Sequence, residues 1–143
     1  MVVLGGVSLW KAFLWWNVIL LLASFFFGVI GLNAAHHHPE LFHDGDEPRD
    51  KDLDWGLAQI DTVRDRVEIK GNVPLTLVLF GEHCLHHLFP TVDHAHLHKL
   101  YPLLEETLDE FGVEYKMGSI WDLIRGQFLQ LARNHSVSFK KTQ

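Results

Sequence analysis

Three histidines in the segment from Gly81 to Pro90 have a spacing that suits a metal site. The segment reads Gly-Glu-His-Cys-Leu-His-His-Leu-Phe-Pro, so His83, His86 and His87 form an H-x-x-H-H pattern. In a helix, side chains three and four residues apart lie on the same face. Neutral imidazoles are good ligands for iron, zinc, copper and nickel. The pattern therefore predicts a metal site, with a histidine-rich surface helix as the alternative.

A second group of histidines, His36 to His38, directly follows a long apolar segment. Ten of the eleven histidines lie between His36 and His98, so the enrichment is local. An accidental polar flank or a loose metal-binding tract is the alternative for this triplet. Asn33 and His37 are four residues apart and would share a helical face.

Other polar residues near the two histidine groups are not predicted to be metal ligands. The pair His94 and His98 has H-x-x-x-H spacing, but we interpret these histidines as surface groups or as neighbours of the true ligands. We interpret the single cysteine, Cys84, as a packing residue rather than a ligand. Carboxylates often orient the outer nitrogen of a metal-binding histidine. Three acidic residues are candidates for that role: Asp44, Glu82 and Asp93.

The elements that must position these histidines begin with a membrane span. The run from Ala12 to Leu32 is almost entirely apolar, and about 20 such residues cross a bilayer as a helix. Trp10, Trp15 and Trp16 near its start are typical of an interfacial aromatic belt. A signal peptide, the alternative, has a shorter apolar core. All lysines and arginines except Lys11 follow the run, so the positive-inside bias places the rest of the chain in the cytosol.

The rest of the chain is predicted to be helical, which gives an all-α integral membrane protein with one transmembrane helix. Charge, glycine and proline predict an exposed loop within Asn33 to Asp54. We predict a mostly buried helix over Leu75 to Leu88, with its histidines facing inward. Capping signals and apolar periodicity predict two further helices: one from Asp93 to Phe111, stopped by Gly112, and a last one opened by Ser119-x-x-Asp122, with Trp121 and Phe128 in the core.

Length and charge limit the classes of function. The chain has 143 residues, enough for one domain at most, and is 48% hydrophobic. Its formal net charge of −6 gives no support for nucleic-acid binding, which needs a clustered basic face.

The segment from Glu82 to Thr91 resembles the third histidine box of membrane fatty acid desaturases, which runs Q-x-x-H-H-L-F-P. The resemblance is to the cytochrome b5-linked branch, which includes the cytochrome b5-related proteins. Front-end members of this branch have glutamine where this chain has His83, whereas acyl-CoA desaturases have histidine there. Over residues 33–131, further segments are similar to the family: Asp54-Trp55 with Gln59, His98-Lys99, Pro102-Leu103-Leu104, and Phe111 to Tyr115.

The resemblance implies a multi-span helical fold in the endoplasmic reticulum membrane, with this region in the cytosol. It implies a di-iron centre that uses oxygen and electrons from cytochrome b5 to introduce a double bond into a fatty acyl substrate. The implied metal ligands are His37, His83, His86 and His87, which supply only part of the ligand shell. His37 is preferred over its neighbours because Asn33 and His37 fit the N-x-x-x-H arrangement of the family.

The first and second histidine boxes of the family have no counterpart in this sequence. We therefore expect a C-terminal portion of a desaturase, a fragment that does not desaturate alone. Its predicted parts are a transmembrane helix over 1–32, the C-terminal part of a desaturase domain over 33–135 and a polar tail over 136–143. The alternatives are a membrane-anchored metal-binding protein, with zinc as the default metal, and a non-catalytic partner of desaturases.

Overall fold

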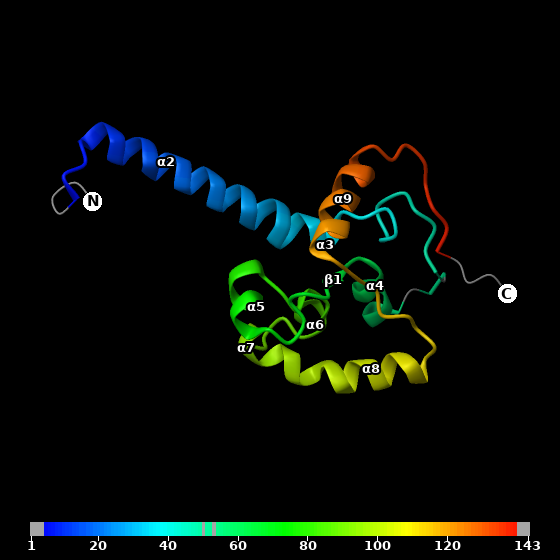
Figure 1. The fold of residues 1–143 in the computed structure, drawn as a ribbon. Helices are drawn as coiled ribbons and strands as arrows, with labels where there is room; N and C mark the ends of the chain where they lie inside the picture. The colour runs from blue at the N-terminus through cyan, green and yellow to red at the C-terminus, as the bar shows by residue number, and fades with distance from the viewer. Residues whose placement is uncertain (1–4, 50, 53, 140–143) are drawn as a thin grey trace.

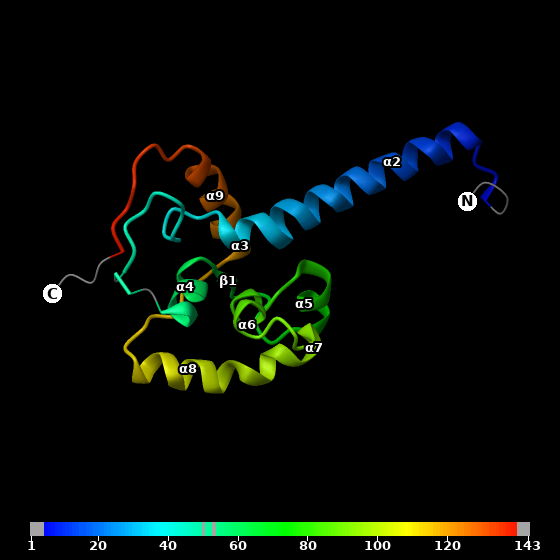
Figure 2. The same ribbon diagram turned by 180° about the vertical axis from the view of Figure 1, so that it is seen from behind.

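The computed structural model describes residues 5–49, 51–52 and 54–139. A long helix projects from a smaller helical body, and the N-terminus lies at the far end of that helix (Figure 1). The same arrangement is seen from behind in Figure 2. The last four residues of the predicted polar tail lie outside the described residues.

The long helix runs without interruption from Leu9 to His36. It consists of α2 (Leu9–Phe25), the π-helical segment η1 (Phe26–Asn33) and α3 (Ala34–His36). Ser8 begins it by accepting a hydrogen bond from the backbone of Lys11. Within the described part of the chain, this is the one helix long and apolar enough to cross a membrane. The predicted span lies inside it, and insertion into a bilayer stays a prediction.

The body is mostly helical, which confirms the helical part of the predicted fold class. Its one sheet among the described residues is a parallel pairing of two-residue strands, β1 (Asp65–Arg66) with β2 (Met117–Gly118). The helices of the body are α4 (Trp55–Asp61), α5 (Val73–Leu79), α6 (His83–Leu88), α7 (His94–Leu97), the 3-10 helix η2 (His98–Leu100), α8 (Tyr101–Glu110) and α9 (Ile120–Leu131).

The hydrophobic core lies between α4, α6, α7 and α8. Leu85 and Leu97 are fully buried at its centre, and Cys84 packs beside them as the sequence indicated. The remaining core residues come from the same helices and from the segments that follow α4 and α8: Ile60, Val63, Tyr101, Leu104, Leu108 and Val113. The histidine helix α6 is therefore fixed on its inner side by apolar packing.

The single helix predicted over Leu75 to Leu88 is wrong, because the chain breaks between α5 and α6. Phe80 and Glu82 both have left-handed backbone conformations, with φ of 54° and 53°. A Cβ atom on Gly81 would overlap the Ile69 side chain, so the turn requires glycine. The buried Glu82 carboxylate accepts hydrogen bonds from the backbone of Gly71 and from Thr76. Two of these contacts, with Ile69 and Gly71, come from outside the segment, so apolar periodicity within it did not reveal the break.

The helix predicted after Asp93 is confirmed in outline as the continuous series α7, η2 and α8. Asp93 begins it by accepting a hydrogen bond from the Ala95 amide at 2.8 Å. Gly112, with φ of 62°, follows its end. The last predicted helix is α9, which Ser119 begins by accepting a hydrogen bond from the Asp122 amide at 3.1 Å.

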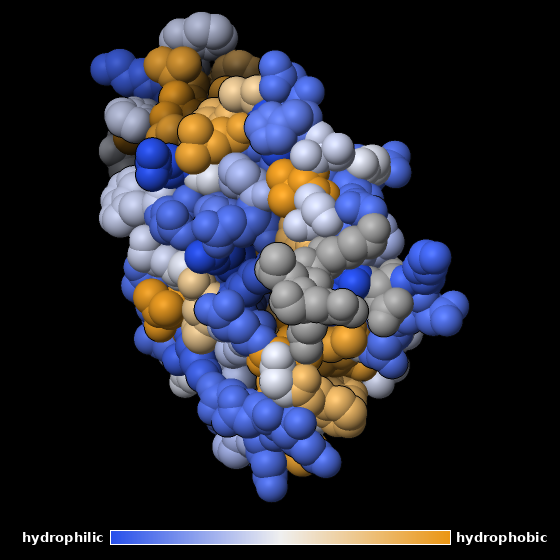
Figure 3. Space-filling model, turned by 90° about the vertical axis from the view of Figure 1, so that its right-hand side faces the viewer, coloured by the Kyte–Doolittle hydropathy of each residue, from blue (hydrophilic) through white to orange (hydrophobic). Residues whose placement is uncertain are grey.

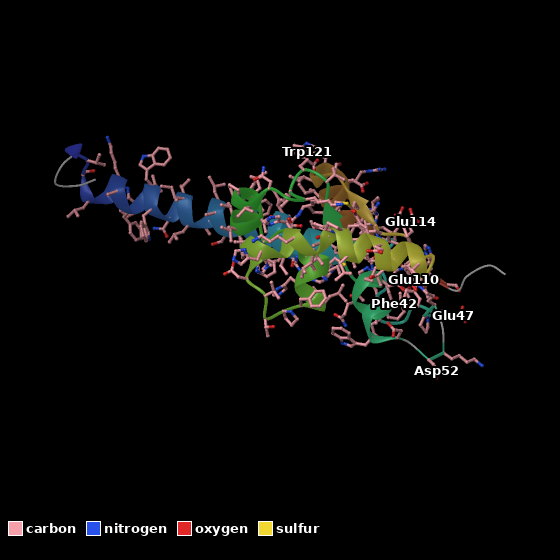
Figure 4. All side chains as sticks on the ribbon, turned by 90° about the horizontal axis from the view of Figure 1, so that it is seen from below. Phe42, Glu47, Asp52, Glu110, Glu114 and Trp121 are labelled. Atoms are coloured by element: carbon pink, nitrogen blue, oxygen red, sulfur yellow. The ribbon has the colours of Figure 1, made fainter. Side chains whose placement is uncertain are left out.

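The prediction that Trp121 and Phe128 belong to the core is wrong. Their side chains are 78% and 57% exposed, and Figure 4 shows Trp121 at the outer side of α9. This helix instead buries Leu123 and the face around Gly126, because that face packs on α3 and η1. The amphipathic pattern predicted the position of the helix correctly. The side of α9 that packs on α3 and η1, however, is the one that carries Gly126.

The loop after the long helix is less exposed than predicted. His38 and Leu41 are buried in it. Ion pairs hold the loop to the body: Arg49 with Asp61 at 2.6 Å, and Asp46 with Arg133 at 2.9 Å. Its dense charge therefore serves partly in buried pairs rather than in solvent.

Charged side chains gather at the end of the body that faces away from α2. Figure 3 shows this face as mainly hydrophilic, with separate apolar patches. Figure 4 labels four acidic residues there: Glu47, Asp52, Glu110 and Glu114. The molecule is therefore polar at one end and apolar along the long helix at the other.

Replacing Gly126 by alanine should destabilise the protein, because the added methyl group would overlap the buried His38 ring. Overpacking of this kind costs about 1–3 kcal/mol. An unobstructed Gly-to-Ala change in a helix would instead stabilise by ~1 kcal/mol. Thermal unfolding in detergent measures the sign. In the double variant with His38→Ala, the penalty of Gly126→Ala should shrink; equal penalties in both backgrounds would contradict this packing.

Candidate metal centre

Three imidazoles converge where the long helix meets α6. His36 comes from the end of α3, while His83 and His87 come from the first and second turns of α6. One ligand atom from each lies within 4.8 Å of the others, and the Nε2 atoms of His36 and His83 are 2.9 Å apart. The three ring centroids are 4.6, 5.0 and 5.2 Å from one another.

These ring separations fit imidazoles that share one ion. A metal–nitrogen bond of about 2.1 Å places a ring centroid about 3.2 Å from the ion. Two rings at adjacent positions on that ion then have centroids about 4.5–5.2 Å apart. The cluster of His36, His83 and His87 therefore has the dimensions of a three-nitrogen metal site.

The outer nitrogens of two of these rings are held by oxygen acceptors. His36 Nδ1 lies 3.1 Å from the carbonyl oxygen of Thr62, and His87 Nδ1 lies 3.1 Å from the side-chain oxygen of Gln59. An oxygen acceptor requires the proton on Nδ1, which leaves the Nε2 lone pair free for a metal. His83 Nδ1 is buried without a partner among the described residues. In His36 and His87, the Nε2 atom is therefore the nitrogen available to bind a metal.

Burial keeps the cluster uncharged. Desolvation, assisted by the neighbouring His36, lowers the pKa of His83 to about 2. Burial and the same neighbour also lower the pKa of His87. Neutral imidazole is the form that binds metals, so the site holds its ligands in the competent protonation state. Burial raises the pKa of the Cys84 thiol, which opposes formation of a competing thiolate.

The carboxylate of Asp65 fixes the start of α6. Glu82 precedes this helix but makes no side-chain cap. Asp65, from β1, accepts hydrogen bonds from the amides of His83 at 2.7 Å and Cys84 at 3.3 Å. The free amides and positive dipole at a helix N-terminus favour an anion in this position. Asp65 also accepts hydrogen bonds from the hydroxyls of Tyr101 and Tyr115, so four donors contact this buried carboxylate.

The four predicted ligands are not all in this cluster. His83 and His87 are in it, whereas His86 lies 6.3 Å from His83 between ring centroids. His37 is exposed, and its ring stacks on His43 at 6.1 Å. The helix ends at His37, with φ of −111° and ψ of 76°, although its amide still donates to the Asn33 carbonyl oxygen at 2.9 Å. Metal binding by His37 and His86 stays a prediction.

Two residues of the site had no assigned role in the sequence. Gln59 was visible as part of the D-W-x-x-x-Q motif, and its spacing from Trp55 places it on α4. The Thr62 carbonyl carries no sequence signal, because any residue offers a backbone oxygen. Of the carboxylates considered as orienters, Glu82 bonds the Gly71 amide and Asp93 caps α7. Asp44 is exposed.

The chain is similar to one known protein family and to several of its curated members. Residues 1–119 match the fatty acid desaturase family. The chain is 47% identical to the cytochrome b5-related protein of Drosophila melanogaster, over 90% of this chain and 29% of that protein. It is 30% identical to the probable Delta(5) fatty acid desaturase C of Dictyostelium discoideum, over 67% of this chain and 23% of that protein.

A third relative is the sn-1 linoleoyl-lipid 6-desaturase of Arthrospira platensis, 34% identical over 59% of this chain and 22% of that protein. The chain thus spans less than a third of the length of each of these curated relatives. No solved structure matches it.

Replacing Asp65 by asparagine should loosen α6, because a neutral amide cannot accept hydrogen bonds from all four donors. Buried hydrogen bonds to a charged group are worth about 1.5–3 kcal/mol each, so a loss of about 2 kcal/mol or more is expected. Chemical unfolding in detergent measures it. The matched control is Asp93→Asn, an equally good helix cap that should change stability little. Equal, small effects of both substitutions would contradict the anchoring role.

Proposed function

This chain belongs to the fatty acid desaturase family, and we propose that it supplies metal ligands to a membrane desaturase that introduces a double bond into a fatty acyl chain. The observation that carries the proposal is the convergence of His36, His83 and His87, with two outer nitrogens held by oxygen acceptors. Two of the relatives are named as desaturases, which supports the same reaction class.

The proposed metal is iron, in a di-iron centre to which this chain contributes part of the ligand shell. His36, His83 and His87 hold one ion, and His86 and His37 are further candidates. Bound iron supplies the activation of oxygen needed to remove hydrogen from an unactivated C–H bond. The chain keeps the imidazoles neutral by burial and orients them through Gln59 and Thr62.

The long helix supports a membrane location for this centre. His36 is the last residue of the apolar helix, so a bilayer around that helix would hold the cluster at the membrane surface. A lipid-borne acyl chain could then reach the metal without crossing much water. We propose that the helix spans the endoplasmic reticulum membrane and that the polar body lies in the cytosol, in line with the lysines and arginines that follow the span.

Cytochrome b5 is the proposed electron donor. The support is the similarity to a protein named as cytochrome b5-related, which covers most of this chain. A cytosolic body would face the same compartment as such a donor.

A membrane-anchored zinc protein is the second candidate, because three nitrogen ligands without a carboxylate also suit structural or catalytic zinc. Metal content of the native protein separates the two candidates. Iron favours the desaturase centre, whereas zinc without iron would favour the alternative.

Removing His36 should weaken metal binding by more than about a hundredfold, because even the outer partners of ligands contribute about 10–100-fold. Replacing Gln59 by leucine should weaken it by about 10–100-fold for that reason. Titration of the purified chain in detergent with Fe(II) under argon measures both. His96→Ala is the control, because His96 is exposed and lies outside the cluster. Loss of binding in His37→Ala but not in His36→Ala would support the sequence-based ligand instead.

Desaturase function is tested at the native gene. Cells fed an isotopically labelled saturated fatty acid should stop forming the labelled unsaturated product when His83 is replaced by alanine. The control is His96→Ala, because His96 is exposed and outside the cluster. Product analysis by mass spectrometry measures the result. An unchanged product profile after deletion of the gene would contradict the proposed reaction.

A further inference from the structure

A second pair of imidazoles lies beside the cluster. His86 from α6 and His94 from α7 face each other with ring centroids 4.6 Å apart and planes tilted by 31°. The Phe80 ring packs against both, at 5.1 Å from His86 and 4.5 Å from His94. The left-handed backbone of Phe80, at the break between α5 and α6, gives its ring this position.

Both imidazoles have a buried nitrogen without a hydrogen-bond partner among the described residues: His86 Nδ1 and His94 Nε2. Leaving a buried polar atom unpaired costs about 1–3 kcal/mol. Two unpaired buried nitrogens on neighbouring rings therefore need an explanation. A metal ion bound by both imidazoles would provide one. His98 also has an unpaired buried nitrogen, but no described ring contact joins it to this pair.

The pair is separate from the cluster of His36, His83 and His87. The His86 ring centroid is 6.3 Å from that of His83 and 6.1 Å from that of His87. These separations exceed the distance of about 4.5–5.2 Å expected for rings at adjacent positions on one ion. The 4.6 Å between His86 and His94 falls within it. The pair and the cluster thus have the dimensions of two neighbouring ion positions.

We propose that His94 is a further metal ligand, which together with His86 holds the second ion of the proposed di-iron centre; this rests on the proposed function of the region as a metal centre. The two imidazoles leave most coordination positions open for other groups. Phe80 shields one side of the pair from water. Asp93, which caps α7 through the Ala95 amide, sets the position of His94 at the start of that helix.

The decisive experiment counts metal ions in the purified full chain in detergent, by anaerobic titration with Co(II) followed through visible absorption and elemental analysis. The wild-type chain should bind two equivalents. His94→Phe keeps an aromatic ring against Phe80 and His86 but removes the nitrogen ligand, so it should bind one equivalent or bind the second at least tenfold more weakly. His96→Phe, two residues away at an exposed position, should still bind two.

The outcomes separate this inference from the proposed function. If His94→Phe and the wild-type chain bind two ions equally well, His94 is not a ligand and the inference is overturned. If the wild-type chain binds a single ion that is lost in His83→Ala, the inference fails while the metal centre stands. If the wild-type chain binds no metal, the proposed function fails. Should His94→Phe unfold, as judged by thermal melting without metal, His94→Gln takes its place with the same expected loss.

Discussion

The buried carboxylate of Asp65 accepts hydrogen bonds from the amides that begin α6 and from two tyrosine hydroxyls. Because α6 has only six residues and Glu82 supplies no cap, little within the helix itself would hold its first turn. The negative charge lies at the positive end of the helix and compensates its unpaired amides. The orientation of His83 and His87 therefore depends on a residue far from them in sequence.

The neighbouring residue, Arg66, positions the other half of the site. Its guanidinium donates to carbonyl oxygens of Ile30 in the long helix and of Leu79 and Phe80 at the end of α5. Successive side chains of a strand point to opposite sides. The two residues of β1 thus hold the histidine helix on one side and the helix that carries His36 on the other, which sets the distance between the two halves of the cluster.

The site combines burial with incomplete hydrogen bonding. Desolvation keeps the imidazoles neutral, and the acceptors at Thr62 and Gln59 leave their inner nitrogens free. A protein that needed these rings only for packing would be better served by apolar side chains, because unpaired buried nitrogens are costly. The arrangement makes physical sense if a cation completes the contacts, and the same reasoning extends to His86 and His94.

Local sequence determined the features that depend on local physics: the apolar length of the first helix, the caps at Asp93 and Ser119, and the H-x-x-H-H spacing of α6. The sequence motifs were also sufficient to identify the fatty acid desaturase family. Only the tertiary structure decided that His36 rather than His37 meets His83, a contact across 47 residues. The tertiary structure also decided three other features: the break at Gly81, the capping of α6 by Asp65, and the pairing of His94 with His86. Each depends on side chains that folding brings together from different segments of the chain.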